Sequence, residues 1–151
     1  MRCFRWILPV FGSLLFACQG SNKPDSEKGL ADIRDTKVMQ YAIEGKTIYE
    51  NLCANCHGLD GMGLGRLIPP INGADYFKED IGRTIRIIKN GQEGSIIVNG
   101  MEYNGVMPAN PKLTNIEIAK LTTYLYNIWG ESRGVISPST VEKYLNEKGS
   151  N

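Results

Sequence analysis

The apolar residues between positions 38 and 52 recur at the spacing of one helix face. They are Val38, Tyr41, Ile48, Tyr49 and Leu52, and Gly45 falls in the same stripe. Such intervals predict an amphipathic helix. Glycine inside a helix costs roughly 0.5–1 kcal/mol relative to alanine. Because Gly45 lies on the apolar stripe, we expect another backbone to approach the helix there.

Further helices are predicted toward the C-terminus. Thr114 and Glu117 match a capping box, and Gly130 is a typical helix stop. A third, shorter helix is predicted over residues 78–89, and a short amphipathic one over 139–147. The apolar residues after the capping box share one face and are Ile118, Leu121, Tyr124, Leu125, Ile128 and Trp129.

The middle of the chain lacks helical periodicity. Asn99-Gly100, flanked by residues 95–98 and 101–103, is a strong signal for a short β-hairpin. Residues 57–76 are rich in glycine and proline. A loop of about 20 residues in so small a domain usually carries function or wraps a bound group.

The N-terminus predicts export. Arg2 and Arg5 precede an apolar run of about 11 residues, well short of the roughly 20 that span a bilayer. The run ends in Leu15-Phe16-Ala17-Cys18, which resembles the lipobox of bacterial lipoproteins. This resemblance implies a signal peptide over 1–17 and a lipid on Cys18. The alternative is ordinary signal cleavage near Ala17, which would leave Cys18 as a free thiol.

Composition limits the rest of the chain to one ordinary domain. The chain has 151 residues, 22% of them charged, and a formal charge of +1. The part from residue 18 onward has 15 basic against 16 acidic residues, so we expect no nucleic-acid binding. The polar residues 18–37 predict a tether, residues 38–130 a compact domain, and 131–151 a tail whose role the sequence does not indicate. We expect a monomer on the periplasmic side of a membrane. The sequence does not decide between the inner and the outer membrane.

The candidate chemistry lies at Cys53, Cys56 and His57, which form a C-x-x-C-H motif. This spacing is the attachment signature of c-type haem, with the two sulfurs on the haem vinyl groups and the histidine on the iron. Three other interpretations compete. A thioredoxin-like pair requires a strand before it and a helix after it, a zinc site usually takes four protein ligands, and a disulfide between residues three apart is rare.

A methionine is the expected second iron ligand. Met39 precedes the motif, Met62 follows His57 too closely, and Met101 falls in the predicted hairpin. Met107 follows Tyr103-Asn104-Gly105-Val106 and precedes Pro108, in a rigid loop that can reach the opposite face of a haem. We therefore predict Met107 as the ligand.

At these residues the chain resembles the class I c-type cytochromes, particularly the small bacterial mono-haem domains, over about residues 38–130. The resemblance implies an all-α fold of three to five helices around one haem, with a short hairpin near 95–103. It pairs Gly45 and Tyr49 with the 121–125 face of the last helix. It implies that a proline carbonyl, from Pro69 or its neighbour Pro70, accepts the imidazole N–H of the proximal histidine. Tyr103 is a further cofactor-binding candidate.

The expected function is electron transfer without enzymatic activity. A haem with both axial positions filled leaves no site for a substrate. The candidate partners are a terminal oxidase, a reductase or a quinol-oxidising complex. The alternatives are a dedicated subunit of a periplasmic complex, and a haem enzyme or ligand sensor in which Met107 does not bind. The predicted apolar haem shell, which favours a moderately positive potential, comprises Tyr49, Leu52, Leu67, Ile71, Ile97, Leu121 and Leu125.

A row of cations recurs at a spacing of three residues on the third predicted helix: Arg83, Arg86 and Lys89. Such a row could steer an acidic partner or approach a haem propionate. The alternative is a solvated helix face.

Overall fold

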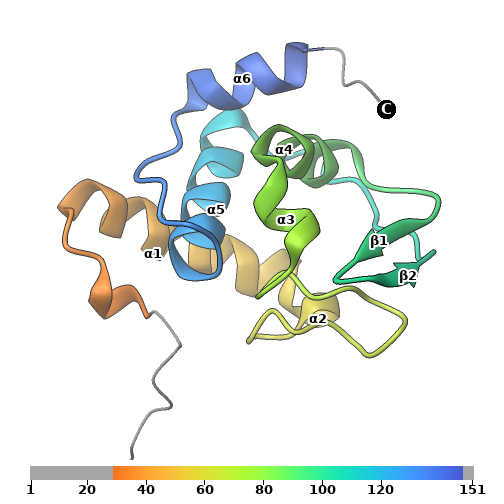
Figure 1. Ribbon diagram of the computed structural model, residues 1–151. Coiled ribbons are helices and arrows are strands. Elements are labelled where there is room, and N and C mark those ends of the chain that lie inside the picture. Colours follow the sequence, from red (N-terminus) through yellow and green to blue (C-terminus); the bar gives the residue numbers. More distant parts are fainter. Residues whose placement is uncertain (1–28, 148–151) are drawn as a thin grey trace, which may run out of the picture.

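The computed structural model describes residues 29–147; Cys18, the expected signal peptide and most of the tether lie outside this range. None of the helices within 29–147 is long and apolar enough to cross a membrane. The elements, shown in Figure 1, are η1 (Leu30–Asp32), α1 (Thr36–Leu52), α2 (Ala54–His57), α3 (Asp75–Glu79), α4 (Ile81–Asn90), β1 (Ile96–Val98), β2 (Met101–Tyr103), α5 (Asn115–Ile128) and α6 (Pro138–Asn146). The expected helical class with one small hairpin is confirmed.

Helices α1 and α5 cross at Gly45. A Cβ atom there would lie 2.1 Å from the carbonyl oxygen of Lys120 and 2.8 Å from Cβ of Tyr124. The Lys120 ammonium also pairs with the carboxylate of Glu44 on α1. The expected close approach of a second backbone to Gly45 is therefore present. It comes from α5, at Lys120 and Tyr124, which lie beside and on the predicted 121–125 face.

Tyr49, one turn after Gly45, links this crossing to the C-x-x-C-H motif. Its ring packs on Tyr124 and Trp129, with ring centroids 5.8 and 5.0 Å away. Its hydroxyl donates a hydrogen bond of 2.6 Å to the carbonyl of Gly58, the residue after the motif. The α1–α5 packing and the motif are thus held by the same side chain.

Both long helices begin at side-chain caps. The Asp35 carboxylate accepts from the amides of Lys37 and Val38 at 2.8 and 2.9 Å, which starts α1 two residues before the apolar stripe. At α5, the Thr114 amide donates to the Glu117 carboxylate at 2.8 Å, and the Glu117 amide donates to the Thr114 hydroxyl at 3.4 Å. The predicted capping box is confirmed.

The helix predicted over residues 78–89 is present as α4, but its predicted start is wrong, because α4 begins only at Ile81. The backbone is extended at Asp80, with φ −140° and ψ 103°, and this residue separates α3 from α4. The Asp80 carboxylate accepts from the Arg83 amide at 2.9 Å and so caps α4. An aspartate three residues before Arg83 is a recognisable N-cap signal that the periodicity alone concealed.

The hairpin forms where Asn99-Gly100 predicted it. Both turn residues have positive φ, 51° and 74°, as the tight turn of a two-residue hairpin requires. In the antiparallel register, Ile96 pairs with Tyr103 and Val98 with Met101.

Reciprocal hydrogen bonds attach the hairpin turn to the start of α3. The Asp75 amide donates to the Asn99 side-chain oxygen at 3.0 Å, and the Asn99 amide donates to the Asp75 carboxylate at 2.7 Å. The hairpin is therefore held against α3.

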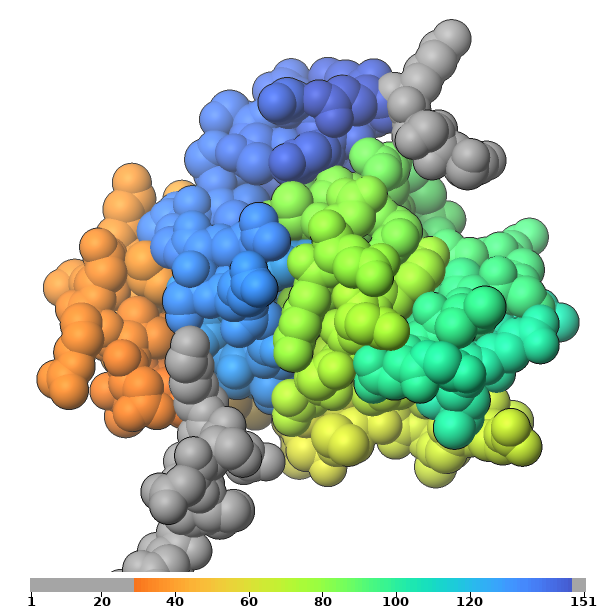
Figure 2. Space-filling view, in the orientation of Figure 1, coloured from red at the N-terminus to blue at the C-terminus, as the bar shows by residue number. Residues whose placement is uncertain are grey.

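The packed core continues past Gly130. Ile136 and Val141 are buried in the same apolar cluster as α5. The Thr123 hydroxyl accepts from the Ile136 amide at 3.0 Å, and the Asn127 side-chain amide donates to the Gly134 carbonyl at 2.9 Å. Figure 2 shows this C-terminal segment seated on α5 and α4, at the end of the molecule away from α2.

Candidate functional site

The C-x-x-C-H motif occupies the junction between α1 and the one-turn helix α2. The Cys53 amide donates to the Tyr49 carbonyl at 2.8 Å, which completes the last turn of α1. The His57 amide then donates to the Cys53 carbonyl at 2.9 Å. Because α2 follows α1 without a loop, the two cysteines and the histidine have a fixed backbone.

His57 is buried and its ring is oriented. Only 8% of its surface is exposed, and its Nδ1 atom lies 3.2 Å from the carbonyl oxygen of Pro69. Burial lowers the pKa of His57, while the bond to Pro69 acts in the opposite direction. Burial therefore favours the neutral imidazole, the state that a metal ligand requires.

The glycine-rich loop after the motif folds back to bring Pro69 to the histidine. The Gly63 amide donates to the His57 carbonyl at 2.8 Å. Gly63 has a φ of +69°, and a Cβ atom there would lie 2.3 Å from the carbonyl oxygen of Ile68. Only glycine fits this close approach of two chain segments. The loop thereby presents the Pro69 carbonyl to the ring.

A largely apolar cavity opens beside His57. The space in and in front of it, open solvent at the mouth included, amounts to about 990 Å³. Cys56, His57, Tyr103 and Met107 all line it. Its other walls come from the loop after the motif, from α3 and α4, from the hairpin and from α5, and include Ile68, Pro69, Ile71, Phe77, Ile87, Ile88, Ile96, Val98 and Leu125.

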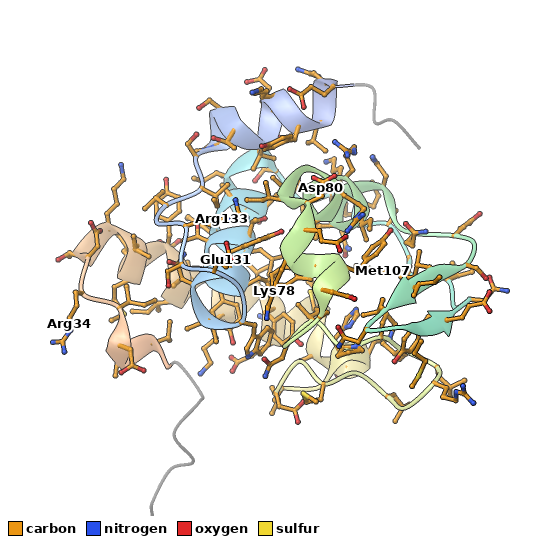
Figure 3. All side chains as sticks on the ribbon, in the orientation of Figure 1. Arg34, Lys78, Asp80, Met107, Glu131 and Arg133 are labelled. Atoms are coloured by element: carbon orange, nitrogen blue, oxygen red, sulfur yellow. The ribbon has the colours of Figure 1, made fainter. Side chains whose placement is uncertain are left out.

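Met107 is the one methionine in residues 29–147 that lines this cavity. It lies beside the end of α4 and the hairpin (Figure 3). Its amide donates to the Gln92 carbonyl and its carbonyl accepts from the Gln92 amide, both at 2.9 Å. Met62 and Met101 are 55% and 37% exposed, and Met39 lies on α1 away from the cavity.

Tyr103 closes one side of the cavity. Its ring is buried, and its hydroxyl donates to the Gly65 carbonyl at 3.3 Å. This bond ties the second strand of the hairpin to the loop that carries Pro69. The structure thus brings six of the predicted residues into one region. Cys53 belongs to it through the motif, and the other five, Cys56, His57, Pro69, Tyr103 and Met107, line the cavity itself.

The predicted apolar shell is partly wrong. Leu67, Ile71 and Leu125 line the cavity. Tyr49 and Leu121 are instead buried in the core where α1 and α5 pack. Leu52 and Ile97 are 52% and 65% exposed. Ile97 points outward because successive residues of a strand face opposite sides, so Ile96 and Val98 line the cavity in its place.

Sequence reasoning missed the contribution of α3 and α4. Phe77, Thr84, Ile87 and Ile88 form one wall. A signal was present, because the segment has isoleucines at helical spacing and a phenylalanine just before them. The break between α3 and α4 at Asp80 was not visible in the pattern.

The cations of α4 make contacts within the protein, so they do not form a simply solvated helix face. Their approach to an acidic partner or a haem propionate stays a prediction. The Arg83 guanidinium lies 3.6 Å from the Tyr76 ring centroid and pairs with Glu79 at 3.3 Å. Arg86 lies 3.7 Å from the Asp80 carboxylate. The Lys89 ammonium donates to two carbonyls of the loop after Met107.

The two cysteines are suited to covalent attachment. They are free thiols, Cys56 exposed and Cys53 half-buried. Burial, and then the neighbouring Cys56, raise the pKa of Cys53 to about 11, the opposite of the lowered pKa of a redox-active cysteine. In residues 29–147 no three His, Cys, Asp or Glu side chains cluster in a way that would hold a metal ion. The zinc and disulfide interpretations therefore find no support.

These residues fit a covalently held haem. The Pro69 carbonyl can only accept a hydrogen bond, so Nδ1 of His57 carries the proton and Nε2 keeps its lone pair for a metal. Two thiols adjoin the histidine, the cavity is apolar, and a thioether sulfur is available from Met107.

Comparison with known proteins agrees with this chemistry. A family model described as Cytochrome c matches residues 42–129, more than half of the chain. Cytochrome c-552 from Thermus thermophilus is 35% identical over 106 residues, covering 66% of this chain and 80% of that protein. The cbb3-type cytochrome c oxidase subunit FixP from Azorhizobium caulinodans is 30% identical over 126 residues, covering 80% of this chain and 38% of that subunit. The family match contains the C-x-x-C-H motif and Met107, and it ends before α6.

Proposed function

This chain belongs to the cytochrome c family, and on that basis we propose that it is an electron carrier that cycles one haem c between Fe(II) and Fe(III). Members of the family bind haem covalently, and Cys53, Cys56 and His57 stand at the attachment positions. The observation that carries the proposal is that His57 and Met107 line the same apolar cavity.

The residues have separate roles in this proposal. Cys53 and Cys56 would hold the haem as thioethers, and His57 would bind the iron through Nε2. The Pro69 carbonyl orients the imidazole and raises its donor strength. Met107 would supply its thioether sulfur as the second protein ligand of the iron. The apolar walls and the methionine favour the reduced state and hence a moderately positive potential.

An exposed apolar surface surrounds the mouth of the cavity and is suited to docking a redox partner. Leu67 and Val106 line the mouth and are each 70% exposed. Leu59, Met62 and Leu64, on the same loop as Leu67, are also exposed. With a near-neutral net charge, long-range steering is modest, so contact of these apolar side chains would carry the docking.

The proposed partners are membrane redox complexes, above all a terminal oxidase. The likeness to cbb3-type oxidase subunits supports this class. It also favours a second candidate, a dedicated subunit of such a complex, because those relatives are named as oxidase subunits. Gel filtration of the native protein separates the two: a shuttle runs as a monomer, whereas a subunit elutes with its complex.

We place the protein on the periplasmic side of a membrane, anchored by lipid on Cys18. The support is the lipobox-like sequence before that residue. A Cys18→Ser variant should move from the membrane to the soluble periplasmic fraction, with its haem spectrum unchanged. Retention of the variant in the membrane would contradict the anchor.

The function is tested by expressing the chain with haem-c maturation enzymes. The haem should remain attached after denaturation, the spectrum should be low-spin, and a redox titration should give a moderately positive midpoint. The Cys53→Ala/Cys56→Ala double variant should lose attached haem, and Met39→Leu should keep it. Rapid carbon monoxide binding by the reduced protein would contradict a carrier and favour a ligand sensor or enzyme.

A further inference from the structure

The loop from Met107 to Leu113 is bonded to the C-terminal end of α4 along its length. At the start of the loop, Met107 and Gln92 exchange two backbone hydrogen bonds of 2.9 Å. Gly91 makes this contact possible, because its φ is +81° and a Cβ atom would lie 2.6 Å from the Met107 carbonyl oxygen. The backbone of Met107 therefore lies directly against the residues that end α4.

Asn110 supplies the missing partners of the last helical carbonyls. Helix ends leave their final carbonyls without intrahelical donors. The Asn110 side-chain amide donates to the Ile88 carbonyl at 3.1 Å, and its backbone amide donates to the Lys89 carbonyl at 3.2 Å. A loop residue three positions after Met107 thus caps α4.

Lys89 makes the reciprocal contact from the helix to the loop. Its ammonium donates to the carbonyls of Pro111 and Leu113 at 2.9 and 2.7 Å. Hydrogen bonds from a charged donor are stronger than neutral ones. Leu113 is buried in the core, so the lysine ties the loop at a fixed point. The loop is held at Met107, in its middle and at its far end.

The same helix also forms a wall of the cavity. Thr84, Ile87 and Ile88 line it, one to two turns before Gln92. A displacement of the end of α4 would therefore move the cavity wall and Met107 together. The hydrogen bonds between the loop and α4 therefore affect the position of Met107 in the cavity, which a helix cap far from the cavity would not do.

We propose that Lys89 and Asn110 are positioning residues, which hold Met107 against the cavity and keep its sulfur on the iron. This inference rests on the proposed function, in which Met107 is the second ligand. For Met107 to leave the iron the loop must open, and opening breaks the bonds made by these two residues. They therefore decide how readily an external ligand displaces the methionine.

The test compares Lys89→Met, which keeps the apolar stem and removes the donor, with Lys112→Met as a matched control. Lys112 lies in the same loop, is exposed and makes no hydrogen bond or ion pair among the described residues. Imidazole is titrated into the ferric holoprotein, and the methionine–iron charge-transfer band is followed. We expect Lys89→Met to bind imidazole roughly tenfold more tightly or more, since a charge-assisted bond pair is lost. Lys112→Met should match the wild type.

A second measurement does not depend on the haem spectrum. Hydrogen exchange should become faster at the amides of Met107 and Leu113 in Lys89→Met, with the hairpin amide of Tyr103 unchanged. Asn110→Ala should shift both readouts in the same direction by a smaller factor, because its backbone bond to Lys89 remains. Should Lys89→Met yield no holoprotein, Asn110→Ala decides the question.

The outcomes separate this inference from the proposed function. If imidazole affinity is unchanged while only the unfolding midpoint falls, Lys89 and Asn110 merely cap α4 and the inference is overturned. If Met107→Ala leaves the charge-transfer band intact, the ligand assignment itself fails. Loss of the band in Met107→Ala, with wild-type imidazole binding in both other variants, rejects the positioning role alone.

Discussion

The Nδ1 atom of His57 lies 3.2 Å from the carbonyl oxygen of Pro69, twelve residues further along the chain. Since a carbonyl only accepts, the proton is on Nδ1, and the ring is fixed with Nε2 free. We expect this ring proton to exchange slowly with solvent in the holoprotein. Nitrogen NMR with labelled histidine measures it, and rapid exchange would show that the bond is not maintained.

Replacement of the proposed second ligand should change the spectrum and the potential. Met107→Ala is expected to lose the methionine–iron charge-transfer band, to lower the midpoint potential and to bind carbon monoxide when reduced, because the iron would lose one of its two protein ligands. Met101→Ala is the control, since Met101 is exposed on the hairpin. If both variants behave like the wild type, another residue occupies the second position.

The helix crossing should not tolerate a side chain at Gly45. A Cβ atom there would lie 2.1 Å from the Lys120 carbonyl oxygen, so α1 and α5 must separate. We expect Gly45→Ala to lower the free energy of unfolding by about 2–3 kcal/mol, although alanine itself favours a helix by about 1 kcal/mol. Urea denaturation measures the change. Gln40→Ala, on the exposed side of α1, should stay within about 0.5 kcal/mol of the wild type.

The clamp between α3 and the hairpin should make stability depend on acid pH. Hydrogen bonds from the amides of Asn99 and Tyr76 lower the pKa of Asp75 below its usual value of 3.8. A carboxyl whose folded pKa is depressed stabilises the fold above its unfolded pKa, and this contribution is lost as pH falls through the folded pKa. We expect Asp75→Asn to be less stable at pH 7 and to lose part of the decline in stability below about pH 4.

Denaturation in urea from pH 7 down to pH 2.5, for the wild type and for Asp75→Asn, tests this dependence. Glu79→Gln is a suitable control, because that carboxylate is exposed in its ion pair with Arg83. Parallel curves for the wild type and Asp75→Asn over the whole range would contradict the role of the clamp.

Local features were predictable because nearby residues fix them. The capping box at Thr114, the turn at Asn99-Gly100 and the helix around Gly45 depend on residues within one or two turns of the chain. The haem attachment motif is equally local, since two thiols and an imidazole at fixed spacing define the chemistry. These features needed no knowledge of distant segments, and each appears in the structure where the sequence indicated it.

Sequence-based predictions were wrong where the same residue spacing is compatible with two local structures. The periodicity of residues 78–89 predicted one helix that continues across Asp80. In the structure α3 ends before Asp80, and its carboxylate caps the start of α4. Ile97 counted as a haem contact because it is apolar. The alternation of a strand, and the side of the hairpin that faces the cavity, place Ile96 and Val98 there in its stead.

The sequence by itself thus determined the cofactor chemistry and the helices that flank it, and the tertiary structure decided what surrounds them. Only the packed chain shows that Lys89 binds the loop of Met107 in place of facing solvent, and that Val141 extends the core beyond Gly130. The physical reason is that burial and hydrogen-bond partners depend on segments far apart in the chain. The spacing of apolar residues predicts which face of a helix is buried, but only the tertiary structure shows which other segment packs against that face.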